Sequence, residues 1–113
     1  MTTFSRGDVV LVMFPFTNQG GSKPRPAVVI STDQYNQNCP DVMIASVTGN
    51  PRPMPHIGDY PIANWQDAGL DAPSIVQTKL VTVEARIILR RVGQLQATDM
   101  AQFEAGLRQA MGL

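Results

Sequence analysis

Apolar residues in the first half of the chain fall into three short runs separated by turn-forming residues. The runs cover residues 9–16, 27–31 and 42–48 and are rich in β-branched side chains, as is typical of strands. The first two flank a loop with Gly20 and Gly21 and predict a hairpin. The third run is almost continuously apolar, so we expect a central strand that is buried on both faces.

The connections and the second half of the chain carry weaker patterns. Residues 32–40 are polar and predict a surface connection or a short helical turn. Four prolines between residues 49 and 61 predict an extended loop, because proline neither donates to a ladder nor continues a helix. Residues 60–63 and 74–83 predict two more strands, and residues 87–93 predict a strand or a helical turn leading into one. Five or six short strands in sequence favour a small barrel.

The C-terminus has the periodicity of an amphipathic helix. Thr98 is a good N-cap and Gly112 is a natural stop, since each is a favoured residue at its end of a helix. Apolar side chains recur at helical spacing between them, at Met100, Phe103, Leu107, Ala110 and Met111. The whole pattern predicts a mainly β fold, a small barrel with a C-terminal α-helix, in which residues 1–113 form a single domain.

The composition indicates a covered surface and excludes several classes of protein. Charged residues make up 16% of the chain and apolar residues 43%, so part of the apolar surface is expected to lie under a partner, which favours a homo-oligomer. The formal net charge of +0 excludes a polybasic nucleic-acid or membrane binder, although not a local basic groove. No segment approaches the ~18 apolar residues of a membrane span. The first residues lack a positive region followed by a long apolar stretch, so we expect no signal peptide. We therefore expect a cytoplasmic protein.

Cofactor and metal chemistry has little support in the sequence. The single Cys39 rules out an internal disulfide and the multi-cysteine metal sites, and no glycine-rich phosphate-binding motif is present. We therefore expect neither a cofactor nor a metal. Cys39 and the only histidine, His56, are the residue types of a nucleophile and its base, but no local motif supports such a pair.

The clearest chemical candidate is an arginine held between two prolines. In Pro24-Arg25-Pro26 the prolines restrict the backbone at the entrance of the second predicted strand, which lowers the entropy lost in placing the guanidinium. A planar, permanently charged guanidinium can bind a phosphate through two hydrogen bonds. The alternative is an ordinary surface arginine in a turn.

Seven pieces of the sequence together resemble one family of toxins. In chain order they are Arg6–Val9, Phe14–Phe16, Lys23–Val29, Ser46–Gly49, Leu70, Ser74–Val76 and Val92–Leu95. By their order and spacing over most of the chain, they resemble the MazF/PemK family of toxin endoribonucleases. The resemblance implies a small SH3-like (MazF/CcdB-type) barrel of five to seven strands with a C-terminal α-helix. It also implies a homodimer that cleaves single-stranded RNA without a metal and is blocked by a small antitoxin that wraps the toxin.

The resemblance assigns catalytic roles to two residues. The family's arginine after the glycine loop corresponds to Arg25, and its threonine at the end of the third strand corresponds to Thr48. The RNA 2′-hydroxyl can itself be the nucleophile, so the enzyme needs to position it and to stabilise charge on the phosphorane. The expected products carry a 2′,3′-cyclic phosphate and a 5′-hydroxyl. Ser46 is the alternative hydroxyl; Thr48 ranks ahead because it ends the strand beside Gly49.

A basic rim and two loops form the candidate RNA-binding surface. Single-stranded bases are read by their edges and by stacking, so base selectivity is expected in the loops of residues 17–22 and 49–57. The candidate RNA-binding residues are Gly20, Gly21, Lys23, Ser46, Gly49, Arg52 and Lys79. His56 would complete the same rim. The alternative is that these charges are scattered and only keep the protein soluble.

The chain departs from the family pattern on the strand that begins near Ser74. Many relatives carry an Asp or Glu followed by Gln or Lys there, whereas this chain reads Gln77-Thr78-Lys79. The missing carboxylate bears on base preference. Two other functions stay open on the same fold, a CcdB-like toxin that binds DNA gyrase and a catalytically silent relative that binds RNA or a peptide. The joint presence of Arg25 and Thr48 favours the nuclease.

Overall fold

The computed structural model of the chain describes residues 4–13, 23–49 and 56–113. Its strands are β1 (Asp8–Val12), β2 (Arg25–Val29), β3 (Asp41–Thr48), β4 (Tyr60–Pro61), β5 (Ile75–Glu84) and β6 (Ile88–Gln94). Its helices are α1 (Asp33–Asn38), α2 (Ala97–Met111) and the short 3-10 turn η1 (Ala85–Ile87). Each predicted strand has its counterpart, although residues 14–16 of the first lie outside the described residues, and the polar connection contains α1.

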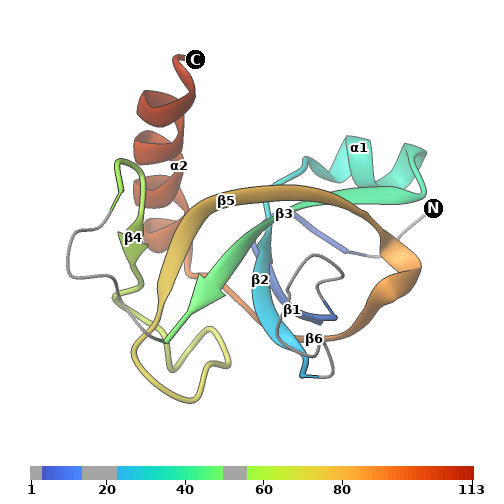
Figure 1. The fold of residues 1–113 in the computed structure, drawn as a ribbon, viewed down its shortest axis with the longest axis horizontal. Coiled ribbons are helices and arrows are strands. Elements are labelled where there is room, and N and C mark those ends of the chain that lie inside the picture. Colours follow the sequence, from blue (N-terminus) through green and yellow to red (C-terminus); the bar gives the residue numbers. More distant parts are fainter. Residues whose placement is uncertain (1–3, 14–22, 50–55) are drawn as a thin grey trace.

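The strands form one antiparallel sheet that curls round on itself. Its order is β4-β5-β3-β2-β1-β6, and β5 arches across the top of it in Figure 1 before η1 leads the chain into β6. Within the described residues no ladder joins the edge strands β4 and β6, so the expected barrel is an open, curled sheet. The sheet ends at β4 because this strand is two residues long and Pro61 has no N–H to donate to a further strand.

Apolar side chains pack on both faces of the central strands. The cluster on one face, here called the inner cluster, consists of Val10, Val12, Ala27, Val29, Val42, Ile44, Val83 and Ile88. The cluster on the other face, the helix-side cluster, consists of Val9, Val28, Ala45, Val47, Ile62, Ala68, Val76, Leu95 and Phe103. Because alternate residues of a strand point to opposite faces, β1, β2 and β3 contribute to both clusters. The prediction that the third run is buried on both faces is confirmed.

The helix α2 covers one face of the sheet and buries Phe103 in the helix-side cluster. It begins at Ala97 after the N-cap Gln96, whose side chain makes no capping hydrogen bond. The prediction that Thr98 is the N-cap is therefore wrong. At the other end Gly112 is the C-cap with φ 74°, in the left-handed region that glycine favours, as predicted. No helix in the described ranges is long and apolar enough to cross a membrane.

A buried carboxylate holds the first turn of α2. Asp99 accepts hydrogen bonds from the Tyr60 hydroxyl (2.5 Å) and from the backbone amides of Ala63 (3.1 Å) and Asn64 (2.9 Å). Burial, together with the hydrogen bond to Asp99, raises the pKa of Tyr60 to about 12. Burial acts to raise the pKa of Asp99 too, but the hydrogen bonds that the carboxylate accepts outweigh it and lower that pKa. The helix is thus tied to the segment that follows β4.

The residues just before β4 pack closely between α2 and β5. Gly58 has φ 90°, which L side chains rarely adopt, and a Cβ built on it would lie 2.5 Å from Cγ2 of Thr78. A Cβ built on Gly106 of α2 would lie 3.2 Å from Cα of Gly58. The carboxylate of Asp59 accepts from the backbone amides of Thr78 (3.1 Å) and His56 (3.1 Å). These contacts fix the helix-side face of β5 at Thr78.

Candidate functional site

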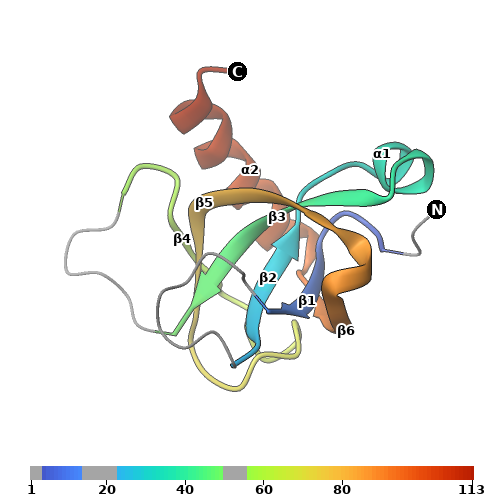
Figure 2. The same cartoon turned by 45° about the vertical axis from the view of Figure 1, so that its right-hand side comes forward.

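One end of the curled sheet collects the residues that the sequence singled out. β2 begins at Arg25 and β3 ends at Thr48. These neighbouring strands are antiparallel, so both residues lie at the same end of the sheet (Figures 1 and 2). The register pairs Ala27 with Ser46, and residues two apart share a face. Arg25, Ser46 and Thr48 therefore belong to the inner face, the face of Ala27.

The pairing of β2 changes at its first residues. The ladder between β2 and β3 stops at the pair of Ala27 and Ser46, whereas Arg25 pairs with Val12 of β1. Arg25 and Thr48 therefore share one end and one face of the sheet without being paired in a ladder. Arg25 is exposed, and Thr48 and Ser46 are half-buried. A ligand at this end of the inner face can reach the guanidinium directly.

The cations near this end have no carboxylate partner in the part of the chain that the structure describes. Lys23, Arg25 and Lys79 are exposed, and none of them forms an ion pair there. Four other cations do pair with carboxylates, namely Arg6, Arg86, Arg91 and Arg108. Cations that are not neutralised within the protein attract an anionic ligand.

The strand β5 brings an irregular stretch to the same region. Its ladder with β3 shifts register between Ala45 and Val47, so residues 77–79 lie opposite Ser46 alone. Gln77 is buried, with 6% of its surface exposed. The sequence indicated this residue only as a departure from a family pattern. Its burial and its place opposite Ser46 follow from the register shift, which no local sequence pattern signals.

The candidate pair of Cys39 and His56 is not assembled. Cys39 lies just before the start of β3, whereas His56 lies near β4, which pairs with β5 beside the other end of β3. β3 has eight residues and so spans about 25 Å, and α1 and β4 stand on opposite sides of the molecule in Figure 1. Within the described ranges no three His, Cys, Asp or Glu side chains are grouped to hold a metal ion.

Three candidate RNA-binding residues lie outside the described residues, namely Gly20, Gly21 and Arg52. The described residues that border their segments, Met13, Lys23 and Gly49, are at the Arg25 end of the sheet. Gly49 is exposed, and a Cβ built there would meet nothing within 4 Å. Packing therefore does not require glycine at this position, and its bare backbone is open to close approach by a ligand.

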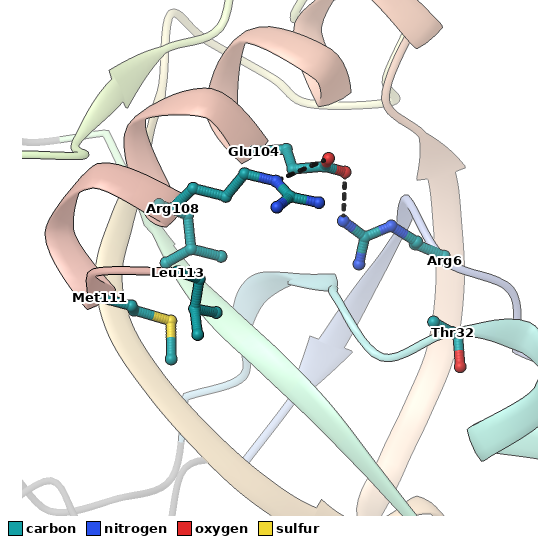
Figure 3. A pocket seen from close by; sticks show the side chains of 7 residues that line it. Arg6, Thr32, Glu104, Arg108, Met111 and Leu113 are labelled. Atoms are coloured by element: carbon teal, nitrogen blue, oxygen red, sulfur yellow. Dashed lines mark hydrogen bonds and ion pairs between the residues drawn. The ribbon is translucent and has the colours of Figure 1, made fainter.

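A hollow of about 360 Å³ at the opposite end of the sheet has a different character (Figure 3). It is lined by Arg6, Thr32, Glu104, Leu107, Arg108, Met111 and Leu113. Glu104 accepts from Nη2 of Arg6 (2.7 Å) and Nε of Arg108 (3.3 Å), and these hydrogen bonds lower the pKa of Glu104, with that from Arg6 the larger cause. Both guanidinium groups are committed to this carboxylate, so the Arg25 end is the better anion site.

Comparison of the sequence with protein families agrees with this architecture. Residues 5–111 match the family described as PemK-like, MazF-like toxin of type II toxin-antitoxin system. No curated protein sequence matches the chain significantly.

Solved structures share the fold from end to end. An endoribonuclease in complex with its cognate antitoxin from Mycobacterial species is 16% identical, with a TM-score of 0.78 over 97% of this chain and 96% of that chain. The toxin MazF-mt6 of Mycobacterium tuberculosis is 20% identical, with a TM-score of 0.74 over 94% and 97%. MazE-MazF (Form-III) from Deinococcus radiodurans is 18% identical, with a TM-score of 0.78 over 99% of both chains. The prediction of a mainly β fold with a C-terminal helix is confirmed.

Proposed function

Because the chain belongs to the family of PemK-like, MazF-like toxins of type II toxin–antitoxin systems, we propose that it is an endoribonuclease that cleaves single-stranded RNA at selected sequences without a metal. One observation carries the proposal. An exposed guanidinium without a carboxylate partner in the described residues, Arg25, shares one end and one face of the sheet with the hydroxyl of Thr48.

The proposed reaction is an internal transesterification. The 2′-hydroxyl gives its proton to solvent and attacks the adjacent phosphorus, the P–O5′ bond breaks, and the departing O5′ takes up a proton from solvent, so that no net proton is lost. The products are a 2′,3′-cyclic phosphate and a 5′-hydroxyl. Since the nucleophile belongs to the RNA, the protein has only to position it and to stabilise the charge that develops on the phosphorane.

The two proposed catalytic residues have complementary roles. Arg25 binds two phosphate oxygens and stabilises the dianionic phosphorane, for which a planar guanidinium is suited. Thr48 donates a hydrogen bond to the phosphate or orients the 2′-hydroxyl, and Ser46 is the alternative hydroxyl on the same face. Arg25 also donates a hydrogen bond to the departing O5′, and the proton that this oxygen takes up is assigned to the solvent, which receives the proton of the 2′-hydroxyl.

The RNA strand is proposed to follow the cations at this end of the sheet. Lys23 and Lys79 are exposed and without ion-pair partners in the described part of the chain, and Gly49 offers open backbone. Gly20, Gly21 and Arg52 complete the proposed RNA-binding set from segments that border the same end. Such contacts to phosphates supply affinity without sequence preference.

Two protein partners belong to the proposal. A second copy of the chain is proposed to cover exposed apolar side chains, because the chain has few charged residues and exposes Met43, Leu80, Met111 and Leu113. A cognate antitoxin is proposed to place an acidic segment over the cations of the RNA site; the mycobacterial structure with its antitoxin has this chain's fold. Together with its RNA substrate, these partners make the proposed location cytoplasmic.

Cleavage of a mixed-sequence single-stranded RNA in EDTA tests the proposal. Wild-type protein should cut at defined sites, and Arg25→Ala should cut at least about 100-fold more slowly, because one group that stabilises transition-state charge is typically worth that much. Arg90→Ala is the matched control, since Arg90 is also an exposed strand arginine without an ion pair in the described residues. It should keep activity and melt at the same temperature as Arg25→Ala.

Two results would contradict the proposal. Equal activity of Arg25→Ala and wild type would remove the assigned role of Arg25. Absence of cleavage across diverse RNAs would remove the nuclease itself and favour the gyrase-binding or the catalytically silent alternative.

A further inference from the structure

One buried polar side chain on β5 has no partner in the described structure. Gln77 has 6% of its surface exposed, and within the described residues no group donates to or accepts from its carboxamide. Buried polar side chains are nearly always hydrogen-bonded, because an unpaired amide loses its hydration without compensation. A buried carboxamide without a partner therefore indicates a group that binds a ligand or serves a function.

The carboxamide belongs to the face that carries the proposed RNA site. Val76 packs in the helix-side cluster, and Thr78 contacts Gly58 beside α2. Alternate residues of a strand point to opposite faces, so Gln77, between these two, points to the inner face. Ser46 and Thr48 lie on that face of the neighbouring strand β3.

The register shift directs Gln77 toward the site. Val47 pairs with Val76 but Ala45 pairs with Leu80, so β5 has two extra residues and bulges where it passes Ser46; residues 77–79 are here called the bowed segment. Bulges of this kind re-aim side chains and are frequent beside active sites. Here the bowed segment lies next to the strand that ends at Thr48.

The backbone of the bowed segment is anchored by a residue that lies before β4. The backbone amide of Thr78 donates to Oδ1 of Asp59 (3.1 Å), and Asp59 also accepts from the amide of His56 (3.1 Å). The stretch is therefore anchored from the helix side, which leaves the carboxamide free to serve a ligand.

We propose that Gln77 is a specificity-determining residue, whose buried carboxamide hydrogen-bonds the edge of a base next to the cleaved phosphodiester. This inference rests on the proposed function. A carboxamide is neutral and presents one donor beside one acceptor, which suits a base edge better than a phosphate. Arg25 lies on the same face, so in this proposal Arg25 binds the phosphate and Gln77 binds the base.

Replacement of Gln77 separates a ligand-binding amide from a structural one. Gln77→Met keeps the length of the side chain and removes its hydrogen-bonding groups. Without RNA it should melt at the same or a higher temperature, because an unpaired buried amide is removed. Base frequencies around the cut, read from the 5′-hydroxyl ends of a randomised RNA at equal extents of cleavage, should lose about 5-fold or more of the preference at one position, as expected for one amide–base contact.

A second substitution gives a directional result. Gln77→Glu replaces the donor by an acceptor, and two adjacent acceptors match the N1–H and N2–H donors of guanine. We expect the preference at the same position to shift toward guanine. Thr78→Val is the matched control; it changes the neighbouring side chain on the opposite face and should leave all base frequencies as in wild type.

The outcomes distinguish this inference from the proposed function. Wild-type protein that cuts no RNA overturns both. Wild-type cleavage with base frequencies unchanged in Gln77→Met and Gln77→Glu overturns the role of Gln77 alone. A fall in melting temperature of about 5 °C or more in Gln77→Met with unchanged frequencies would identify Gln77 as a structural amide.

Discussion

Arg25 and Arg91 show how the surroundings of one side-chain type set its task. Arg91 donates from Nε to Asp8 (3.1 Å), whose side chain is 3% exposed, so its charge is neutralised within the protein. Arg25 is exposed at the start of β2 and has no such partner in the described part of the chain. An unpaired guanidinium can bind phosphate without first breaking an ion pair. This difference is why the phosphate is assigned to Arg25.

Replacing each hydroxyl on the inner face decides which one acts with Arg25. Thr48→Val keeps the shape of the side chain, and we expect kcat to fall by about 10²–10³, as for the loss of one donor to a transition state. Ser46→Ala should cost less than about 10-fold, because Ser46 lies inside the ladder opposite Ala27. Initial rates on a fluorogenic RNA measure both variants. If Ser46→Ala lost more activity than Thr48→Val, Ser46 would be the hydroxyl that acts with Arg25.

The sequence locates a residue at the end of a strand where a proline or glycine lies beside it. Arg25 stands between prolines, and Thr48 precedes a glycine, and the structure brings both to one end of the sheet. Gln77 has neither a proline nor a glycine beside it. Its burial depends on a register shift between two strands, so the sequence gives its departure from a pattern but not its surroundings.

At the scale of elements, apolar runs predict the strands, and distant contacts set where the elements end. The helix α2 begins at Ala97 and not after Thr98, and its first turn is held by Asp99, whose partners Tyr60 and Asn64 lie more than thirty residues away. The predicted small barrel is an open, curled sheet, because its edge strand β4 contains Pro61 and is two residues long. Neither feature produces a repeating pattern of apolar residues along the sequence.

The hydrogen bond between Tyr60 and Asp99 predicts a stability loss at high pH. Burial and the hydrogen bond to Asp99 raise the pKa of Tyr60 to about 12 in the folded protein, above the ordinary tyrosine value of about 10. The folded state therefore holds this proton more tightly, and its contribution is complete below pH 10 and lost as the pH rises through 12. The free energy of unfolding should fall more steeply over this range in wild type than in Tyr60→Phe.

Urea unfolding at several pH values between 9 and 12 measures this difference. At neutral pH Tyr60→Phe should be less stable by about 1.5–3 kcal/mol, the usual contribution of one hydrogen bond to a charged group. The gap between the two proteins should narrow as the pH rises. Parallel curves for the two proteins would show that Tyr60 does not retain its proton through this bond.

At the scale of the whole molecule, the two ends of the sheet differ in charge and in apolar exposure. The Arg25 end has exposed cations without partners in the described residues, whereas at the other end Glu104 binds Arg6 and Arg108. Met111 and Leu113 are exposed at the Glu104 end. Two exposed apolar side chains of the sheet, Met43 and Leu80, are each 37% exposed and share the helix-side face of neighbouring strands. A partner on this face would leave the proposed RNA site open.

Oligomeric state tests the proposed use of that face. Wild-type protein should sediment at about twice 12.3 kDa, and Leu80→Glu should sediment as a monomer at micromolar concentration, because a buried, unpaired carboxylate opposes association. Leu89→Glu, at an exposed leucine of β6, is the control and should remain dimeric. A monomeric wild type would remove the proposed dimer, and a dimeric Leu80→Glu would move it to another face.

The central claim is that the RNA supplies its own nucleophile to a site formed by Arg25 and Thr48. Its most direct test compares two oligonucleotides that carry a mapped cut site and differ only in a 2′-deoxynucleotide immediately 5′ of the cleaved phosphodiester. The all-ribose strand should give a 2′,3′-cyclic phosphate and a 5′-hydroxyl, and the deoxy strand should stay intact while still binding. Cleavage of the deoxy strand at a similar rate would show that water or a protein group is the nucleophile, and would contradict the account.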